Sequence, residues 1–344
     1  MVSIIIPHWN GVDVLSECLE SLKKTRYSDY EIIVVDNAST DNSVEWIKKD
    51  HSDIILVQND KNYGYAGGCN RGAKVANGDY LVFLNNDTIQ DQDWLAPMVR
   101  RMNSDSNIVA IQPKILNYFQ RDLFDYAGGT GGHMDILCFP FTRGRMFLNQ
   151  EVDKGQYDTA ETCFWASGTA MMVRKDSFKM ANGFDEIFFA HMEEIDLCWR
   201  FHAMGLDIWS EPESVVFHKN AVSMPMYSHQ KYYLNHRNAQ LMLLGNYSLL
   251  LALYLGLIRF ILELIACIYA MVKLDWNHVT GIIRAFWWLL FHPHRIWQKR
   301  KRFKKLREVK DNDIMKKMLK KSVVMLSLIH ISEPTRLGMI SYAV

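Results

Sequence analysis

The chain has 344 residues, with 39 Lys and Arg against 38 Asp and Glu, and a formal net charge of +1. This length allows a full hydrophobic core with room for one large domain and an appendage, and the near-zero charge argues against a nucleic acid partner. Six scattered cysteines without a C-x-x-C pair indicate buried thiols in a reducing compartment rather than a zinc site.

The two ends of the chain differ in character. An apolar run begins directly at Val2, without a basic and then apolar leader, so we expect the functional site to face the cytoplasm. Residues 326–344 resemble the conceptual translation of a sequencing adapter followed by a primer. We therefore expect this segment to be an artefact and the natural C-terminus to be missing, and we leave it out of the fold prediction.

Buried strands alternate with amphipathic helices over residues 1–90. Short apolar runs predict strands at 2–6, 31–35, 54–57 and 80–84. Strand, helix and strand with short connections predict an α/β fold with a doubly wound, mostly parallel, Rossmann-like sheet. Neither a G-x-G-x-x-G motif after the first strand nor a P-loop motif occurs, which disfavours an NAD-binding domain and a P-loop NTPase.

The apolar run 80–84 stops abruptly at Asn85, Asn86 and Asp87. A run this short and uniform is typical of a central strand buried on both faces. Open α/β sheets bind ligands beyond the carboxyl ends of their strands, where a fixed carboxylate can hold a divalent metal and the phosphates that it neutralises. The alternative is that Asp87 caps the next helix. The glycine-rich loop 62–72 could likewise bring backbone N–H groups against a phosphate or a base, or serve close packing.

A predicted helix near residues 192–201 begins with acidic side chains. Neighbouring residues lie about 100° apart on a helix, so the acids cannot all share one side. One of them can point to the sheet edge as a base while another pairs with Arg200, or together they can form an ordinary acidic helix start beside the N-terminal dipole. These acids are Glu193, Glu194 and Asp196.

Two more segments of the second half have candidate roles. Residues 118–164 show a weak pattern, and because long loops in compact domains are usually functional they are our candidate acceptor lid. A short strand is predicted at 207–209 and another at 214–217, followed by His218. This histidine is a possible metal ligand, with a structural role as the alternative.

These segments, in this order and spacing, resemble the family 2 glycosyltransferases, and more closely the bacterial rhamnosyltransferase-like group. The resemblance covers residues 1–233. Its marks are Ser3-Ile4-Ile5-Ile6-Pro7 with Asn10-Gly11, Val35-Asp36-Asn37-Ala38-Ser39-Thr40-Asp41, Asn62 through Asn70-Arg71-Gly72, Gly78-Asp79-Tyr80 leading to Leu84-Asn85-Asn86-Asp87, Gly183-Phe184-Asp185-Glu186, and Glu193-Glu194-Ile195-Asp196-Leu197-Cys198-Trp199-Arg200 with His218 downstream.

The resemblance implies a GT-A fold, a sugar donor carried on dTDP, UDP or GDP, a divalent cation (Mg²⁺ or Mn²⁺) and inversion at the anomeric carbon. It implies that Asp87 binds the metal bridging the diphosphate, that His218 completes the metal site, and that Glu194 is the catalytic base. Asp36 would contact the nucleotide base and Arg71 would help to hold the nucleotide. The whole implied set for the nucleotide sugar is Pro7, Asn10, Asp36, Asn37, Asn62, Gly64, Asn70, Arg71, Asn85 and Asn86.

Two positions depart from the family's pattern. The D-x-D signature is Asn85-Asn86-Asp87 here, so only its last carboxylate is present and metal binding leans on His218 and the diphosphate. The base position carries Glu194 where aspartate is common, which leaves Asp196 as the alternative base. The implied chemistry needs no covalent enzyme intermediate, because a carboxylate takes the proton from the acceptor hydroxyl as it attacks.

The region after the resemblance is apolar and then basic. Residues 248–272 are interrupted by only two charged residues, Arg259 and Glu263, which are four positions apart and can pair. Insertion costs of about +2.5 to +3.5 kcal/mol for each charge roughly cancel the gain from the apolar residues, so the segment can span a membrane or lie in it. The second apolar segment, 279–291, is too short to cross. Tryptophans flank both segments.

The run 295–321 holds 13 Lys and Arg against 3 Asp and Glu. Tryptophans followed by such a run favour an interfacial helix on an anionic membrane surface, and a soluble helical subdomain is the alternative. We therefore predict a GT-A domain over 1–235 and a helical, membrane-associating basic region over 236–325. The tryptophans beside or within these segments are Trp276, Trp287, Trp288 and Trp297.

Together these features predict an inverting glycosyltransferase on the cytoplasmic side of the bacterial inner membrane, held there peripherally or monotopically. It would move a sugar, with rhamnose as one candidate, to a hydroxyl of a lipid-linked or polysaccharide acceptor in cell-surface glycan synthesis. A processive polysaccharide synthase is an alternative, although the Q-x-x-R-W motif is absent. A nucleotidyltransferase lacks support because its glycine- and arginine-rich opening loop is missing, and a scaffold without catalytic activity is the alternative from another class.

Overall fold

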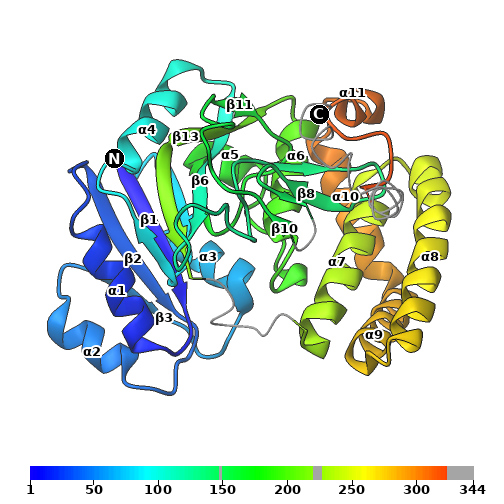
Figure 1. Ribbon diagram of the computed structural model, residues 1–344, viewed down its shortest axis with the longest axis horizontal. Helices are drawn as coiled ribbons and strands as arrows, with labels where there is room; N and C mark the ends of the chain where they lie inside the picture. The colour runs from blue at the N-terminus through cyan, green and yellow to red at the C-terminus, as the bar shows by residue number, and fades with distance from the viewer. Residues whose placement is uncertain (147–148, 220–226, 324–344) are drawn as a thin grey trace. The chain divides into compact units, whose positions relative to one another are not determined.

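The computed structural model describes residues 1–146, 149–219 and 227–323 (Figure 1). The described residues form two compact units. Unit 1 holds the described parts of 1–132, 142–201 and 206–220, and unit 2 holds 133–141, 202–205 and 227–323. The predicted artefact at 326–344 lies outside the described residues.

Unit 1 is built on a nine-stranded sheet in the order β11-β13-β6-β12-β4-β1-β2-β3, with β5 paired to β13. Strands β4, β1, β2 and β3 are parallel neighbours, and β13 runs parallel to β6, while β12, β5 and β11 are antiparallel to their partners. The strands are β1 (Val2–His8), β2 (Tyr30–Asp36), β3 (Ile55–Gln58), β4 (Tyr80–Leu84), β5 (Thr88–Gln90), β6 (Ile108–Asn117), β11 (Glu161–Thr162), β12 (Ala170–Arg174) and β13 (Asp207–His218).

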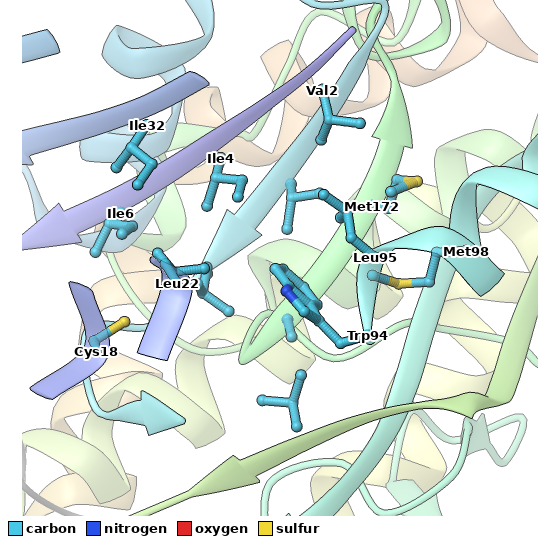
Figure 2. Close-up of a cluster of buried hydrophobic side chains, with 14 of the residues drawn as sticks. Val2, Ile4, Ile6, Cys18, Leu22, Ile32, Trp94, Leu95, Met98 and Met172 are labelled. Atoms are coloured by element: carbon cyan, nitrogen blue, oxygen red, sulfur yellow. The ribbon is translucent and has the colours of Figure 1, made fainter. Parts of the chain in front are cut away.

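Helices cover both faces of this sheet because successive strand side chains point to opposite faces. On one face Ile4 and Ile6 of β1 pack with the buried side of α1 and with Trp94 at the start of α4 (Figure 2). On the other face α3 approaches so closely that a side-chain carbon on Gly72 would lie 2.4 Å from Ile5 Cγ2. The helices are α1 (Val12–Leu22), α2 (Ser43–Asp50), α3 (Gly64–Val75), α4 (Leu95–Ser104), α5 (Lys175–Met180), η1 (Glu186–Phe188) and α6 (Glu193–Ala203).

The predicted parallel core is confirmed, and two predictions of the second half need correction. The segment 118–164, predicted as loop, contains short strands in a second sheet of order β10-β9-β8-β7. The strands predicted at 207–209 and 214–217 are one strand, β13, whose pairing with β6 is irregular between Glu211 and Val215. Pro212 lies inside that irregularity, where a missing N–H is tolerated. The short strands are β7 (Gly132–Met134), β8 (Pro140–Thr142), β9 (Arg145–Met146) and β10 (Asn149–Gln150).

Unit 2 is helical. Its helices are α7 (His229–Asn246), α8 (Leu249–Val272), α9 (Trp276–Phe291), α10 (Pro293–Leu306) and α11 (Asp311–Met315). Helix α7 packs against α8, α9 and α10. Pro293 at the first turn of α10 separates that helix from α9, since proline is favoured at a helix start but not within one. The domain boundary predicted after residue 235 falls within α7.

Candidate functional site

The carboxyl ends of β1, β2 and β4 meet at one edge of the sheet because these strands are parallel. His8, the last residue of β1, is opposite Asp36, the last residue of β2. The His8 ring also joins β1 to the end of β4, with Nδ1 lying 2.9 Å from Asn86 Nδ2, while its Nε2 lies 2.9 Å from Ser43 Oγ. Desolvation lowers the pKa of His8, so a neutral ring that can accept one hydrogen bond and donate another fits both contacts.

Asp36 and Asn37 are buried at the carboxyl end of β2, where we predict that the nucleotide binds. The Asp36 carboxylate is only 2% exposed and accepts the Ser39 N–H. Asn37 donates to the Gly64 carbonyl at 3.2 Å. A side-chain carbon on Gly68 would lie 3.1 Å from Pro7 Cβ, so the glycine-rich segment packs directly on the ends of β1 and β2. Glycine here serves close packing.

Two predicted binding residues hold loops in shape. Asn10 has a positive φ of 57° and accepts the Thr40 N–H at 2.8 Å, which ties the loop after β1 to the loop after β2. Asn62 accepts the Gly64 N–H at 2.8 Å, in a turn where Gly64 has a φ of +70°. Both asparagines therefore shape the edge where a nucleotide would lie.

Asn70 and Arg71 of α3 reach the segment before α6. Asn70 donates to the Phe184 carbonyl and accepts its N–H, both at 2.9 Å. Arg71 forms an ion pair with Glu186 at 3.3 Å, and its guanidinium lies 3.4 Å from the centre of the Tyr63 ring. Arg71 already has a carboxylate partner, so holding a nucleotide phosphate would mean sharing or exchanging it.

Asp87 and His218 are brought together by the pairing of β5 with the end of β13. His218 Nε2 lies 3.2 Å from Asp87 Oδ1, and both side chains are buried. On the far side of the ring, Nδ1 lies 2.9 Å from a carboxylate oxygen of the fully buried Asp125. Burial opposes a charged imidazole, but these two carboxylates raise the pKa of His218 to about 10. Burial also acts to raise the pKa of Asp87, and His218 more than offsets this, so that pKa is lowered.

The residues at this point suit a divalent ion. Asp87 Oδ1 is buried and makes no hydrogen bond of good geometry, although it faces the imidazole. Two ligands at right angles, each about 2.1 Å from one ion, lie about 3 Å apart, which matches the 3.2 Å between Asp87 Oδ1 and His218 Nε2. A carboxylate on the second ring nitrogen of a metal-binding histidine is a common arrangement. Among the described residues no group of three or more His, Cys, Asp or Glu forms a closed metal cage, so substrate oxygens would supply further ligands.

The two asparagines before Asp87 differ in their contacts. Asn86 contacts His8 as described above, whereas the Asn85 backbone N–H donates to the carbonyl of Thr169, just before β12, at 2.9 Å. The Asn85 side chain is partly exposed at the sheet edge.

A strained segment precedes α6. Phe189, His191 and Met192 have positive φ values of 65°, 66° and 73°, which are unfavourable for residues with a side chain. The Phe189 carbonyl accepts the Ala66 N–H at 3.3 Å, and a side-chain carbon on Gly64 would lie 2.3 Å from that oxygen. The glycine-rich segment thus packs directly against the entry to the helix that carries the predicted base.

Glu193 and Glu194 start α6 in a desolvated environment. The Oε2 atom of each is buried without a hydrogen-bond partner. Desolvation raises the pKa of Glu194 to about 7, and desolvation and the Glu194 charge raise the pKa of Glu193 well above its ordinary value. Burial is the main cause that raises the pKa values of Tyr65 and Cys69 of α3; Glu193 adds to both shifts, and Glu194 adds to that of Tyr65. A carboxyl group with a pKa near 7 is well matched to proton transfer.

Asp196 has a different environment. It is fully buried, and its carboxylate pairs with Arg200 Nε at 3.0 Å. Arg200 in turn donates to the Gly183 carbonyl at 2.6 Å, so the pair fastens α6 to the segment before it. This geometry favours Glu194 over Asp196 as the candidate base.

We expect Asp196→Asn to lower the free energy of unfolding by about 3–5 kcal/mol, because removing one partner of a buried ion pair leaves the other charge without compensation. Thermal and denaturant unfolding of the purified protein would measure this. Glu213→Gln is the matched control, since its pair with Arg100 is exposed and worth at most about 1 kcal/mol. An Asp196→Asn variant of normal stability with abolished turnover would return the base role to Asp196.

Sequence reasoning missed Asp125 and did not predict the burial of Glu193. Asp125 was missed because it lies in the weakly patterned segment 118–164, and no motif marks it. It is placed by the chain that turns back after β6, where the Asp125 N–H donates to the Ile115 carbonyl at 2.9 Å. Glu193 was noticed as part of an acidic helix start, but its burial depends on α3, which the sequence does not show to be a neighbour.

The sheet and its covering helices form an α/β fold of the GT-A type, as we predict from the sequence. The chain belongs to glycosyl transferase family 2, whose family model matches residues 3–179.

Curated relatives share only part of their length with this chain. The O-antigen biosynthesis protein RfbC of Myxococcus xanthus is 29% identical over 228 residues, which is 64% of this chain and 17% of that protein. The poly-beta-1,6-N-acetyl-D-glucosamine synthase of Staphylococcus aureus strain MSSA476 is 32% identical over 120 residues, which is 34% of this chain and 29% of that protein. The poly(ribitol-phosphate) beta-glucosyltransferase of Bacillus spizizenii is 38% identical over 92 residues, which is 25% of this chain and 14% of that protein.

Solved structures share the fold. A crystal structure of GalNAc-T7 with UDP, GalNAc and Mn²⁺ has a TM-score of 0.58 at 17% identity, covering 72% of this chain and 48% of that one. A mannosyltransferase from Pyrobaculum calidifontis in complex with GDP-Man and Mn²⁺ has a TM-score of 0.52 at 16% identity, covering 89% of this chain and 85% of that one.

Proposed function

We propose that this protein is a metal-dependent, inverting glycosyltransferase that moves a sugar from a nucleotide-diphosphate donor to an acceptor hydroxyl. The observation that carries the proposal is the buried Asp87–His218 pair, 3.2 Å apart and backed by Asp125, at the edge of the sheet where the family binds its donor. The two structural neighbours are complexes with Mn²⁺ and with UDP or GDP-Man, which supports a divalent ion and a nucleotide-sugar donor here.

In this mechanism the residues of the chain have separate tasks. Asp36, Asn37 and the glycine-rich segment would receive the nucleoside, and Asp87 with His218 would hold the ion. A bound divalent ion would offset the negative charge that grows on the departing diphosphate. Glu194, ionised above a pH of about 7, takes the proton of the acceptor hydroxyl as that oxygen attacks the anomeric carbon. A single displacement of this kind inverts the configuration.

The proposed setting is the synthesis of a cell-surface glycan. Support comes from the names of the relatives: an O-antigen biosynthesis protein, a poly-beta-1,6-N-acetyl-D-glucosamine synthase and a poly(ribitol-phosphate) beta-glucosyltransferase. The acceptor that we propose is a lipid-linked or polysaccharide glycan, and rhamnose remains a candidate sugar.

The proposed location is the cytoplasmic face of the bacterial inner membrane. Within the described residues, one helix, Leu249–Val272, is long and apolar enough to cross a membrane. Only 22% of its most apolar 18-residue stretch is buried. The exposed basic residues of α10 supply positive charge for an anionic surface.

A panel of dTDP-, UDP- and GDP-sugars tests the enzymatic part of the proposal. We expect one donor to be hydrolysed slowly, and transferred rapidly once an acceptor is present, with Mn²⁺ or Mg²⁺ and not with EDTA. The readout is release of the nucleoside diphosphate, followed by analysis of the anomeric configuration of the product. No hydrolysis and no binding of any donor, with the protein folded, would favour the scaffold instead.

A further inference from the structure

Helix α8 presents a broad apolar face outside its own unit's core. Residues along its whole length are more than two-fifths exposed, including Leu250 at 82% and Val272 at 75%. Apolar residues of α9 add to the exposed apolar area, with Leu290 and Phe291 both at 66%. A face of this kind on a soluble protein marks an interaction site. The exposed apolar residues of α8 are Leu249, Leu250, Leu253, Tyr254, Leu257, Phe260, Ile261, Leu264, Ile265, Ile268, Tyr269, Met271 and Val272.

The opposite stripe of α8 is buried and contains its two charges. Arg259 is 3% exposed and Glu263 is 2% exposed, and they pair at 2.9 Å. Arg259 also donates to the Leu137 carbonyl at 2.8 Å, and its guanidinium lies 3.5 Å from the centre of the Phe139 ring. Both charges are thus held by the segment 133–141 and by α8 itself, away from the apolar face.

Polar residues of α7 and α9 extend from the buried pair Arg259 and Glu263. Together these residues form a polar seam between the helices. Glu263 Oε2 lies 2.5 Å from His236 Nδ1, and His236 Nε2 lies 2.9 Å from His278 Nε2. Tyr232 stacks on His278, with ring centres 4.1 Å apart, and its hydroxyl donates to Asp275 at 2.9 Å. Figure 1 shows α7, α8 and α9 side by side in unit 2.

This seam decides between the two ways in which α8 can meet a bilayer. With 24 residues, α8 is about 36 Å long, so its length alone suits a crossing of the hydrocarbon core of about 30 Å. A crossing α8 would have to take polar residues of α7 and the 133–141 backbone into hydrocarbon, or leave Arg259 and Glu263 there without these partners. Both are unfavourable. An α8 lying along the surface keeps every contact of the seam and immerses only its apolar face.

We propose that α8 and α9 form a monotopic hairpin that lies in the cytoplasmic leaflet of an anionic membrane and does not cross it. The inference rests on the proposed membrane location. Charge complementarity favours an anionic lipid surface over a protein partner, because α10 follows the hairpin directly and exposes a tryptophan among several lysine and arginine side chains. These residues are Arg295, Trp297, Lys301, Arg302, Lys304 and Lys305.

Thiol labelling of the full chain in membrane vesicles tests the topology. Cys267 is half-buried and is replaced by serine, and the other five cysteines are buried. Single cysteines are then introduced by Ser248→Cys at the start of α8 and by Lys273→Cys at its end, both at exposed positions. Glu213→Cys, on the surface of unit 1, marks the cytoplasmic side.

We expect a membrane-impermeant maleimide to label all three thiols in inside-out vesicles and none in right-side-out vesicles. Labelling of Lys273→Cys from the outside alone would show a crossing and overturn the inference. A Lys273→Cys thiol that reacts in detergent but in neither vesicle type would place the turn in hydrocarbon, which also contradicts it.

Recovery of the protein in the supernatant of a low-salt lysate would overturn the inference together with the proposed location. Donor hydrolysis measured on the same samples distinguishes that result from a failure of the proposed enzymatic activity.

Discussion

Asp87→Ala is expected to abolish sugar transfer, with a loss on the order of 1,000-fold or more, because a bound metal contributes several kcal/mol to stabilising charge in the transition state. Asp87 is the sole carboxylate of the Asn85-Asn86-Asp87 sequence, and its buried Oδ1 faces His218. Steady-state turnover and binding of the nucleoside diphosphate with and without Mn²⁺ are the measurements. The variant should lose the part of nucleotide affinity that depends on metal and keep the part that does not.

Asp125→Asn is the matched variant for this site. Asp125 contacts Nδ1 of His218, whereas Asp87 faces Nε2 on the other side of the ring. Removing the Asp125 carboxylate should therefore weaken metal affinity by about 10–100-fold without eliminating it. Excess Mn²⁺ should therefore rescue Asp125→Asn and not Asp87→Ala. Circular dichroism confirms that both are folded. Full activity of Asp87→Ala in EDTA would rule out the metal assignment.

Glu194→Gln is expected to lower kcat by about 100- to 10,000-fold while donor affinity stays nearly unchanged, since general base catalysis acts in the transition state. The amide has nearly the shape of the carboxylic acid, so the buried start of α6 should remain intact. Turnover and donor dissociation constants, measured on the same preparation, provide the test. A loss of donor affinity equal to the loss of kcat would mean that Glu194 positions the donor instead.

The pH profile gives this prediction a second readout. Desolvation raises the pKa of Glu194 to about 7, and the base must be ionised, so activity should fall as the pH drops through about 7. Glu193→Gln removes the neighbouring carboxyl group, whose pKa is raised well above its ordinary value by desolvation and by the Glu194 charge, and should retain most of the activity. A Glu193→Gln variant as inactive as Glu194→Gln, with an unchanged pH profile, would move the base to Glu193.

Much of the fold was predictable because its signals are local. Each parallel strand from β1 to β4 is a short apolar run followed by polar residues, and the helices of this half have amphipathic spacing. Strand β13 was predicted as two strands because Pro212 and two glutamates interrupt its apolar pattern, whereas pairing with β6 holds the strand together across the interruption. The short strands of 118–164 depend on contacts between distant residues, and no local period marks them.

The candidate site shows the same division. Asp36 and Asp87 follow apolar strands directly, so their position at the sheet edge follows from the strands. That His218 meets Asp87 depends on the pairing of β5 with β13, and that Asp125 stands behind His218 depends on a turn in a weakly patterned segment. Sequence spacing left open whether Glu194 or Asp196 is the base. The structure favours Glu194 as the candidate, because Asp196 is buried in an ion pair with Arg200.

The contact between Gly64 and Phe189 limits how the protein can be re-engineered. The glycine-rich segment, which would receive the donor, and the strained segment that leads to Glu194 share one interface with no space for a methyl group. Exchanging segment 62–72 for that of a relative with another nucleotide preference would therefore also shift α6, which carries the proposed base. Successful hybrids need the two segments, 62–72 and 183–194, to be transplanted together as one block.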